Sequence, residues 1–326
     1  MSNYREFRRR ARRRRRQKQL AAVSAVLLAA VLLGGAAWLT LRRKAGGAES
    51  VPVSAAADSA SVPAATAAPT PAPAADTDWN RSDYAVRVLN TSIAQQDDGT
   101  TAMDFRLAAQ PECGVVDLSY FDTATFIGDS ITQGLELYTE GLPNAHYCAY
   151  KGVGPNAIVN NTECTRLDGT KEIPMDALVA SQPDEVYILL GTNVLTRLGS
   201  ETAFLAYYGQ MLDMIRQALP GCVIYVQSIT PVRPELQRKS PGLNQTRLRG
   251  INDELAALAL SKGCVFLDLW ECLSDENGDL RADFAAKDGY HLQPAGYTAW
   301  VNYLRTHTKY RSGVVYEEGT GYYIAG

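Results

Sequence analysis

The sequence predicts an α/β fold, a three-layer α/β/α domain built around a doubly wound parallel sheet. From about residue 119 onward, short apolar runs rich in Val and Ile alternate with longer segments of helical periodicity. The runs are too apolar for strands with one wetted face, which indicates a sheet covered on both sides. Polar residues follow two of the runs, where ligand sites of such sheets form. With 46% hydrophobic residues, the chain of 326 can build a proper core.

Five runs are expected to be strands: 124–127, 146–150, 185–190, 223–227 and 265–269. Six intervening or following segments are expected to be helices: near 131–139, 155–162, 174–181, 201–218, 245–262 and 294–307. The clearest is 201–218, where Phe204, Tyr208 and Ile215 recur at helical spacing. We assign this aromatic and aliphatic stripe to the core, not to a cofactor site.

The segment 20–41 is uncharged, and its 22 residues are long enough as a helix to cross the hydrocarbon core of a bilayer. Ten basic residues precede it and three follow it. The heavier positive flank predicts a single-pass protein of the cell membrane, with residues 1–19 cytoplasmic and the body extracytoplasmic. A cleaved signal peptide is the alternative, but its apolar core is usually shorter, and Ala36-Ala37-Trp38 is a poor cleavage site.

Charge is divided sharply along the chain. Residues 1–44 contain thirteen of the 32 Lys/Arg and one of the 35 Asp/Glu, so the remainder carries 19 bases and 34 acids, a net charge of −15. The arginine run also resembles a nucleic-acid patch. Beside a membrane segment it is better interpreted as a topology signal, and we expect no nucleic-acid partner.

The remaining segments differ in composition. Residues 42–76 are mostly Ala, Pro, Ser and Thr after the basic flank, and predict a disordered tether. Residues 77–118 predict a small hairpin extension of the body, and 310–326 form a tail that could add an edge hairpin. All six cysteines follow the membrane segment, which permits disulfides in fifteen pairings, although three of them lie in apparent buried strands.

Gly128-Asp129-Ser130 ends the first apolar run and opens a helix. This places a serine hydroxyl at the carboxyl edge of the sheet, beside the free N–H groups of a helix N-terminus. An ordinary helix-capping turn, with Asp129 as the N-cap, is the competing interpretation. Near the other end of the chain, Asp288 and His291 supply a carboxylate and an imidazole three residues apart. Serine, histidine and aspartate together suggest nucleophilic acyl transfer.

Two further strand ends carry groups that could bind an oxyanion. The run 185–190 ends in Gly191-Thr192-Asn193, and the Asn193 amide can donate a hydrogen bond. The run 146–150 leads into a loop with Gly152 and Gly154, where glycine allows a backbone N–H to approach a ligand closely.

These segments, in this order, resemble the SGNH hydrolases, also called the GDSL esterase/lipase family. The resemblance spans about 123–307 and includes Thr132 and Gly134 after the serine, and Leu292, Pro294, Gly296 and Tyr297 after the histidine. It implies a flavodoxin-like domain, 119–309, with Ser130 as nucleophile, His291 as general base and Asp288 as its orienting partner. It also implies an oxyanion hole of the Ser130 N–H, a glycine N–H and Asn193.

The chain departs from the family pattern in two places. Its glycine block is loose, so Gly154 is our first choice as donor and Gly152 is close behind. The residue after Asn193 is Val194, where the family often has an acid, and this puts the hydrogen-bonded support of that loop in question.

The resulting prediction is an extracytoplasmic serine esterase that needs no metal or cofactor. Its location suggests O-acetyl groups on cell-wall glycans as substrates, with lipid esters second. An O-acyltransferase that uses the same triad, a catalytically silent glycan-binding module and a membrane assembly protein remain as alternatives. Asp275, Asn277 and Asp279 resemble a calcium loop only superficially, because Gly278 and Ala286 occupy the wrong positions.

Overall fold

The computed structural model describes residues 93–95, 101–138, 142 and 144–317. The predicted cytoplasmic segment, membrane helix and tether lie outside these residues and stay predictions. Within the described part of the chain, no helix combines the length and the apolar composition that crossing a membrane requires.

The centre of the domain is a parallel sheet in the order β10-β9-β8-β4-β5. Its strands are β4 (Ala124–Gly128), β5 (His146–Ala149), β8 (Glu185–Leu189), β9 (Val223–Gln227) and β10 (Val265–Leu267). The chain runs from β4 outward to β5 and then crosses back to β8, so the order is that of flavodoxin-like folds. The parallel sheet predicted from the sequence is confirmed, and its switch point lies between β4 and β8.

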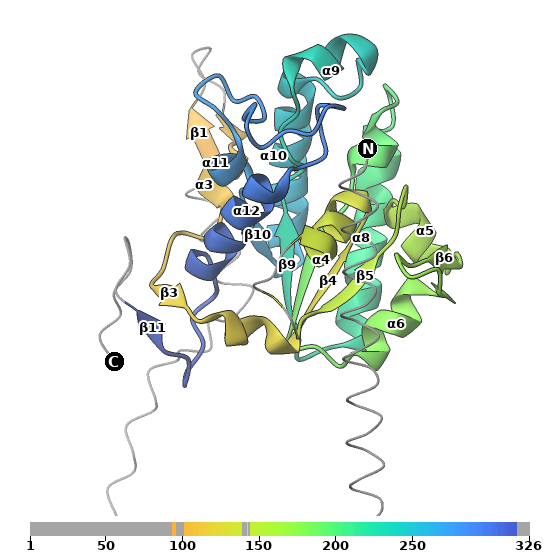
Figure 1. The fold of residues 1–326 in the computed structure, drawn as a ribbon, viewed down its shortest axis with the longest axis vertical. Helices are drawn as coiled ribbons and strands as arrows, with labels where there is room; N and C mark the ends of the chain where they lie inside the picture. Colours follow the sequence, from red (N-terminus) through yellow and green to blue (C-terminus); the bar gives the residue numbers. More distant parts are fainter. Residues whose placement is uncertain (1–92, 96–100, 139–141, 143, 318–326) are drawn as a thin grey trace, which may run out of the picture. The chain divides into compact units, whose positions relative to one another are not determined.

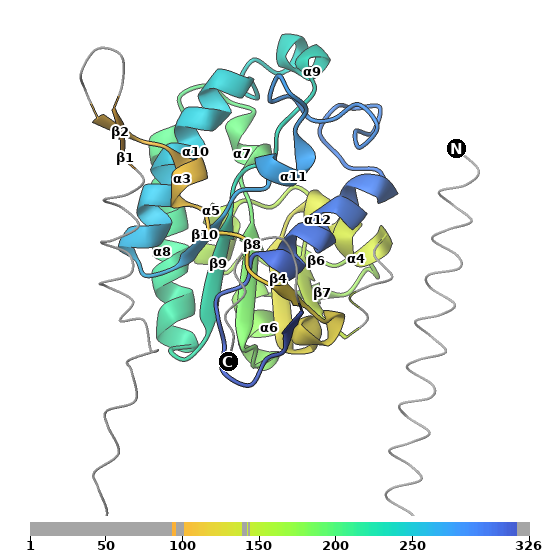
Figure 2. The same ribbon diagram turned by 90° about the vertical axis from the view of Figure 1, so that its left-hand side faces the viewer.

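Helices cover both faces of the sheet (Figures 1 and 2). One core cluster joins the sheet to α5 (Pro155–Val159), α6 (Pro174–Ala180), α8 (Glu201–Ala218) and α10 (Gln245–Ser261). The other joins it to α4 (Ser130–Tyr138), α11 (Trp270–Leu273) and α12 (Pro294–Thr306). These are the three layers expected from alternating apolar strands and amphipathic helices.

An aromatic ladder crosses the second face of the sheet. Tyr147, Phe126, Tyr187 and Tyr225 are register partners on successive strands. Their rings stack at centroid separations of 5.4, 4.9 and 4.4 Å. Cross-strand aromatic pairs stabilise a sheet beyond the area they bury. The ladder therefore helps to fix the register of β4 against its two neighbours. The register in turn sets the relative positions of the strand ends at which the site loops begin.

The N-terminal extension contains an antiparallel pair, β1 (Ile93–Gln95) with β2 (Thr101–Met103), followed by α3 (Phe105–Ala108). Phe105 is buried against the rings of Phe266 and Trp270, at 6.4 and 5.9 Å, and its N–H donates to Asp253. The extension is thus part of the core around α10 and β10.

The described part of the tail contains one short strand. This strand, β11 (Tyr316–Glu317), pairs with β3 (Val115–Val116), from the extension. Arg311 pairs with Asp184, just before β8, at 2.9 Å, and with the buried Glu185, the first residue of β8. The described part of the tail therefore forms a contact between the two ends of the folded domain, and the edge hairpin expected for 310–326 stays a prediction because 318–326 lie outside the described residues.

The remaining short elements are the 3-10 helix η1 (Leu118–Thr123), α7 (Thr192–Leu195), α9 (Pro234–Lys239) and the pair β6 (Cys164–Thr165) with β7 (Lys171–Glu172). The sequence did not indicate them, because elements of two to six residues show no periodicity. No disulfide joins the six cysteines, all of which lie in the described residues, and five are buried, so they act as small core residues. Asp275 accepts from the N–H groups of Asn277 and Asp279, which makes a plain acidic turn.

Asp268 supplies a stability prediction. Its side chain follows β10 and accepts from the Trp270 N–H at 2.9 Å, and burial raises the pKa of its carboxyl to about 7. The folded state therefore holds a proton that the unfolded chain releases near pH 4, so stability falls as pH rises from about 4 to about 7. Asp268→Asn keeps the acceptor and cannot ionise. We expect the variant to be more stable than the wild type by about 2–4 kcal/mol at pH 8 and equal to it at pH 4.

Urea unfolding at the two pH values measures this difference. The exposed Asp283, which pairs with Arg281 at 2.8 Å, provides the control variant Asp283→Asn. A stability gain of Asp268→Asn that is the same at pH 4 and pH 8 would contradict the account, because the gain would then not come from ionisation.

Candidate active site

Three side chains form a hydrogen-bonded chain at the carboxyl edge of the sheet. His291 Nε2 lies 2.8 Å from Ser130 Oγ, and His291 Nδ1 lies 2.7 Å from Asp288 Oδ2. Ser130 begins α4 directly after β4, and the other two residues lie in the loop before α12. The structure thus brings together the three residues that were predicted from the sequence, although 161 positions separate Ser130 from His291.

Packing between α4 and α12 sets the distance between serine and histidine. A Cβ at Gly134 would overlap the Tyr297 hydroxyl, and that hydroxyl donates to the Ile131 carbonyl at 3.1 Å. Gly128 is equally constrained, since a Cβ there would lie 2.7 Å from the Leu189 carbonyl oxygen. The small and aromatic residues around the two motifs therefore have a structural role. They bring the helix that follows His291 against the helix that begins with Ser130.

Asp288 is held in its ionised form. Burial by itself would raise the pKa of its carboxyl, but hydrogen bonds outweigh that effect and lower it below the usual value. Oδ2 faces the His291 ring, while Oδ1 accepts from the N–H groups of His291 and Tyr290 at 3.0 and 3.2 Å. Gly289 makes the turn at φ +87°, and its carbonyl accepts from the Arg233 N–H at 2.8 Å. The carboxylate is therefore fixed on both oxygens.

Asn193 lies on α7, after β8, and its amide donates to Asp129 Oδ2 at 2.7 Å. Asp129 is 1% exposed, and its other oxygen accepts from the Ile131 N–H at 2.9 Å. Burial raises the pKa of Asp129 to about 6, against the opposing effect of these hydrogen bonds and of His291. Asp129 is thus both the helix cap considered above and the partner that orients Asn193 across the switch point.

The two candidate glycines differ in their surroundings. Gly154 is buried at the start of α5, and a Cβ there would overlap Val194, the neighbour of Asn193. Gly152 is exposed at φ +77°, with nothing within 4 Å of its Cβ position. Among the described residues, the N–H groups of Gly154 and Ser130 have no hydrogen-bond partner. Gly154 therefore suits an oxyanion donor better than Gly152 does.

Arg247, on α10, supports the Asn193 loop, and no sequence pattern indicated this role. Its guanidinium donates to the Leu195 and Arg197 carbonyls at 2.7 and 2.9 Å, to the Gly242 carbonyl, and to Glu201. This network supplies the loop support that the presence of Val194 had put in question. The sequence contains no pattern that predicts this role, because Arg247 lies 52 residues beyond Leu195 and belongs to no motif.

The other two histidines lie outside this arrangement. His146 is exposed at the start of β5, at the opposite end of the strand from the serine. His307 is buried at the end of α12, where its ring stacks on Tyr303 at 3.8 Å and burial lowers its pKa. Neither of these histidines forms a hydrogen bond with Ser130.

Comparison with known proteins gives the family. The model of the GDSL-like Lipase/Acylhydrolase family matches residues 126–299, more than half of the chain. A search of curated proteins found no significant match.

Three of the solved structures that match this chain are the following. A protein from Streptococcus pneumonia, named as a candidate platelet activating factor, is 22% identical over 57% of this chain and 87% of its own, with a TM-score of 0.46. A GDSL-like lipase from Bacteroides thetaiotaomicron is 16% identical over 68% and 93%, with a TM-score of 0.43. A carbohydrate esterase family 3 protein from Talaromyces cellulolyticus is 16% identical over 56% and 93%, with a TM-score of 0.40.

The family model covers the serine, glycine, asparagine and histidine segments in a single match. The resemblance to SGNH hydrolases is therefore confirmed: this chain belongs to the GDSL-like lipase/acylhydrolase family, and it is a hydrolase.

Proposed function

We propose that this protein is a serine ester hydrolase that acts through an acyl-Ser130 intermediate. The observation that carries the proposal is the continuous chain from Ser130 Oγ to His291 and on to Asp288, at 2.8 and 2.7 Å. These are the distances that a nucleophile, its base and the orienting group require. The presence of all three hydrogen-bonded side chains counts against the alternative of a catalytically silent glycan-binding module.

The reaction runs in two stages. Ser130 Oγ attacks the ester carbonyl while its proton passes to His291 Nε2, and collapse of the tetrahedral intermediate transfers that proton to the departing alcohol. A water then attacks the acyl-serine, with His291 again taking a proton and returning it to Ser130. Asp288 stays ionised throughout and stabilises the imidazolium.

The oxyanion is proposed to bind to three donors: the Ser130 N–H, the Gly154 N–H and the second amide proton of Asn193. The first two have no other partner among the described residues. Asn193 has one proton committed to Asp129, and the other points toward the Val153 carbonyl at a long 3.4 Å, a contact that is easily exchanged for an oxyanion. Asp129 thereby orients this amide before substrate arrives.

For the substrate we propose O-acetyl groups on cell-envelope glycans, with lipid esters second. This rests on the predicted membrane helix 20–41 and the extracytoplasmic position that its basic flank implies. A tether of Ala, Pro, Ser and Thr would let the domain reach polymer at a distance from the bilayer.

Ester hydrolysis by the full-length chain in detergent tests the proposal. We expect turnover of p-nitrophenyl acetate that falls with longer acyl chains and disappears in Ser130→Ala. A preference for long chains would favour lipid esters. Absence of Ser130-dependent hydrolysis, with acetyl transfer to a glycan acceptor instead, would replace the hydrolase by the acyltransferase alternative.

Arg247→Ala is expected to lower kcat for ester hydrolysis about tenfold with a smaller change in KM. The Asn193 loop would lose the guanidinium bonds to the Leu195 and Arg197 carbonyls, and misplacing an oxyanion donor weakens only the transition state. In an Asn193→Ala background the same substitution should cost little more, because the donor is already gone.

The chain offers a matched control in Arg216. Its guanidinium also holds a loop through backbone carbonyls, those of Lys262 and Gly263 at 3.1 and 3.2 Å, at the other edge of the sheet. Arg216→Ala should lower thermal stability without changing kcat. Equal losses of kcat in the two arginine variants would mean that Arg247 acts only on general stability.

A further inference from the structure

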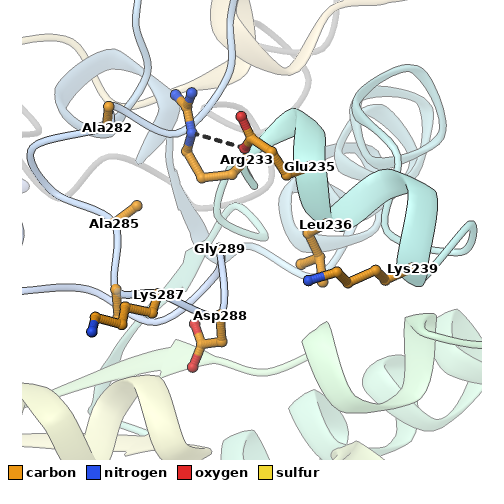
Figure 3. Close-up of a pocket in the computed structure, with 10 residues that line it drawn as sticks. Arg233, Glu235, Leu236, Lys239, Ala282, Ala285, Lys287, Asp288 and Gly289 are labelled. Carbon is orange, nitrogen blue, oxygen red and sulfur yellow. Dashed lines mark ion pairs between the residues drawn. The ribbon is translucent and has the colours of Figure 1, made fainter.

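A pocket of about 350 Å³ adjoins the catalytic loop, on the side of Asp288 (Figure 3). It lies between α9 and the segment 282–289, and this volume is at the lower end of small-molecule sites. The residues that line it are Arg233, Glu235, Leu236, Lys239, Ala282, Ala285, Ala286, Lys287, Asp288 and Gly289. Asp288 belongs both to this pocket and to the hydrogen-bonded chain, so a group bound here lies one side chain away from His291.

The charged half of the lining favours a polar group over a long acyl chain. Five of its ten residues are charged: Arg233, Glu235, Lys239, Lys287 and Asp288. Burying a hydrocarbon tail among ionised groups would desolvate them without compensation. The three alanines in the wall leave room for a compact polar group, which is the character of an alcohol leaving group and not of the acyl part of an ester.

Most of the charges in the pocket are already paired. Arg233 contacts Glu235 at 3.4 Å and Asp275 at 3.6 Å, and donates to the Leu280 carbonyl at 2.7 Å. Asp288 is satisfied by His291 and by two backbone N–H groups. Lys239 and Lys287 have no ion-pair partner in the part of the chain that the structure describes. Figure 3 shows them on opposite sides of Asp288, one from α9 and one from the loop.

These two ammonium groups line one pocket on a body that is otherwise acidic, since residues 45–326 carry a net charge of −15. Such a surface repels anions at long range, so a local pair of cations beside the site would select for an anion that is presented there. We infer that this pocket binds a carboxylate or phosphate on the alcohol part of the substrate, so that the preferred substrate is an O-acylated acidic sugar. The inference rests on the proposed ester hydrolase function and adds the class of its leaving group.

A matched set of acetylated sugars tests the inference on the full-length chain: acetylated galactose, galacturonic acid and galactose 6-phosphate. At low salt, kcat/KM should be about tenfold higher for either acidic sugar than for the neutral one, as two exposed ion pairs allow. The preference should shrink as salt screens the charges. The ratio between the two acidic sugars decides between a carboxylate and a phosphate.

The double variant Lys239→Gln/Lys287→Gln should bring the acidic-to-neutral ratio close to one. Lys262→Gln, in which the lost lysine pairs with Asp213 at 2.7 Å at the end of α10, should keep the wild-type ratio. Equal Ser130-dependent turnover of acidic and neutral sugars, or a preference that survives in the double variant, would overturn the inference and leave the hydrolase intact. Faster turnover of phospholipid vesicles than of any sugar would overturn it as well.

Failure of the proposed hydrolase function can be distinguished from failure of the anion-binding inference. If no ester is hydrolysed, binding of galacturonate and galactose to Ser130→Ala, measured by calorimetry, still reports on the pocket. Tighter binding of galacturonate that the two lysine substitutions abolish would support the anion site. Equal binding of the two sugars would refute it.

Discussion

Replacing Asp288 by asparagine is expected to reduce kcat by roughly 10²–10⁴-fold with little loss of stability. Asp288 Oδ1 is fixed by the N–H groups of Tyr290 and His291, so the asparagine oxygen will take that position. Its NH2 group then faces His291 Nδ1, which must accept, and the ring proton moves to Nε2. Nε2 could no longer accept the Ser130 proton, although every distance would be unchanged.

The variant is measured by steady-state hydrolysis of p-nitrophenyl acetate together with thermal unfolding. Asp283→Asn, at an exposed carboxylate of the same loop, controls for the loss of one charge. The upper limit is the effect seen in a serine protease, and because Asp288 is 44% exposed, water can replace part of its role. Full activity of Asp288→Asn with a folded protein would remove this residue from the mechanism.

Replacing Asn193 by alanine is expected to lower kcat by about 10²–10³-fold while KM changes little, because an oxyanion donor acts on the transition state and not on the bound ester. The same change leaves the buried Asp129 without its 2.7 Å partner, which is expected to cost about 1–3 kcal/mol of stability. The two effects are separable, since activity can be measured well below the unfolding temperature.

The control for Asn193 is Asp129→Asn. It removes the buried charge, keeps an acceptor for the Ile131 N–H, and leaves the Asn193 donor in the chain. Its own NH2 group would replace the acceptor Oδ2 and face the Asn193 amide, so the orientation of the donor is weakened but the donor is kept. The expected loss of kcat is therefore smaller than in Asn193→Ala, which removes the donor altogether. An Asn193→Ala variant that raises KM and keeps kcat would show that this side chain only binds substrate.

Most of the sheet could be predicted from the sequence, because each strand is a continuous apolar run. Three strands end one or two residues earlier than predicted, at Ala149, Leu189 and Leu267. The reason is that their last apolar residues turn into the loops that follow, and the loops after Ala149 and Leu189 carry residues of the site. At Gly191, for instance, the backbone leaves the sheet at φ +154°. Hydrophobicity alone cannot distinguish a buried strand from the buried beginning of a loop.

The proximity of Ser130 and His291 could also be predicted from the sequence, because chain order and parallel topology place both at the carboxyl edge of the sheet. The contacts that hold these two residues in place could not be predicted from the sequence. The contacts of Arg247 with the Asn193 loop and of Arg311 with β8 join residues about 50 and 126 positions apart, outside any local pattern. The ring stacking of Tyr187 on Tyr225 depends on strand register, which only the folded sheet defines. Long-range polar pairing is therefore the part of this fold that sequence reasoning misses.

The most direct test is to look for the acyl group on Ser130. The full-length protein is mixed with p-nitrophenyl acetate, quenched in acid within the first turnover, digested and analysed by mass spectrometry. The account predicts an acetyl group on the peptide that contains Ser130 and none on the same peptide of Ser130→Ala. Ester hydrolysis without acetyl on Ser130, or with acetyl on another residue, would contradict it.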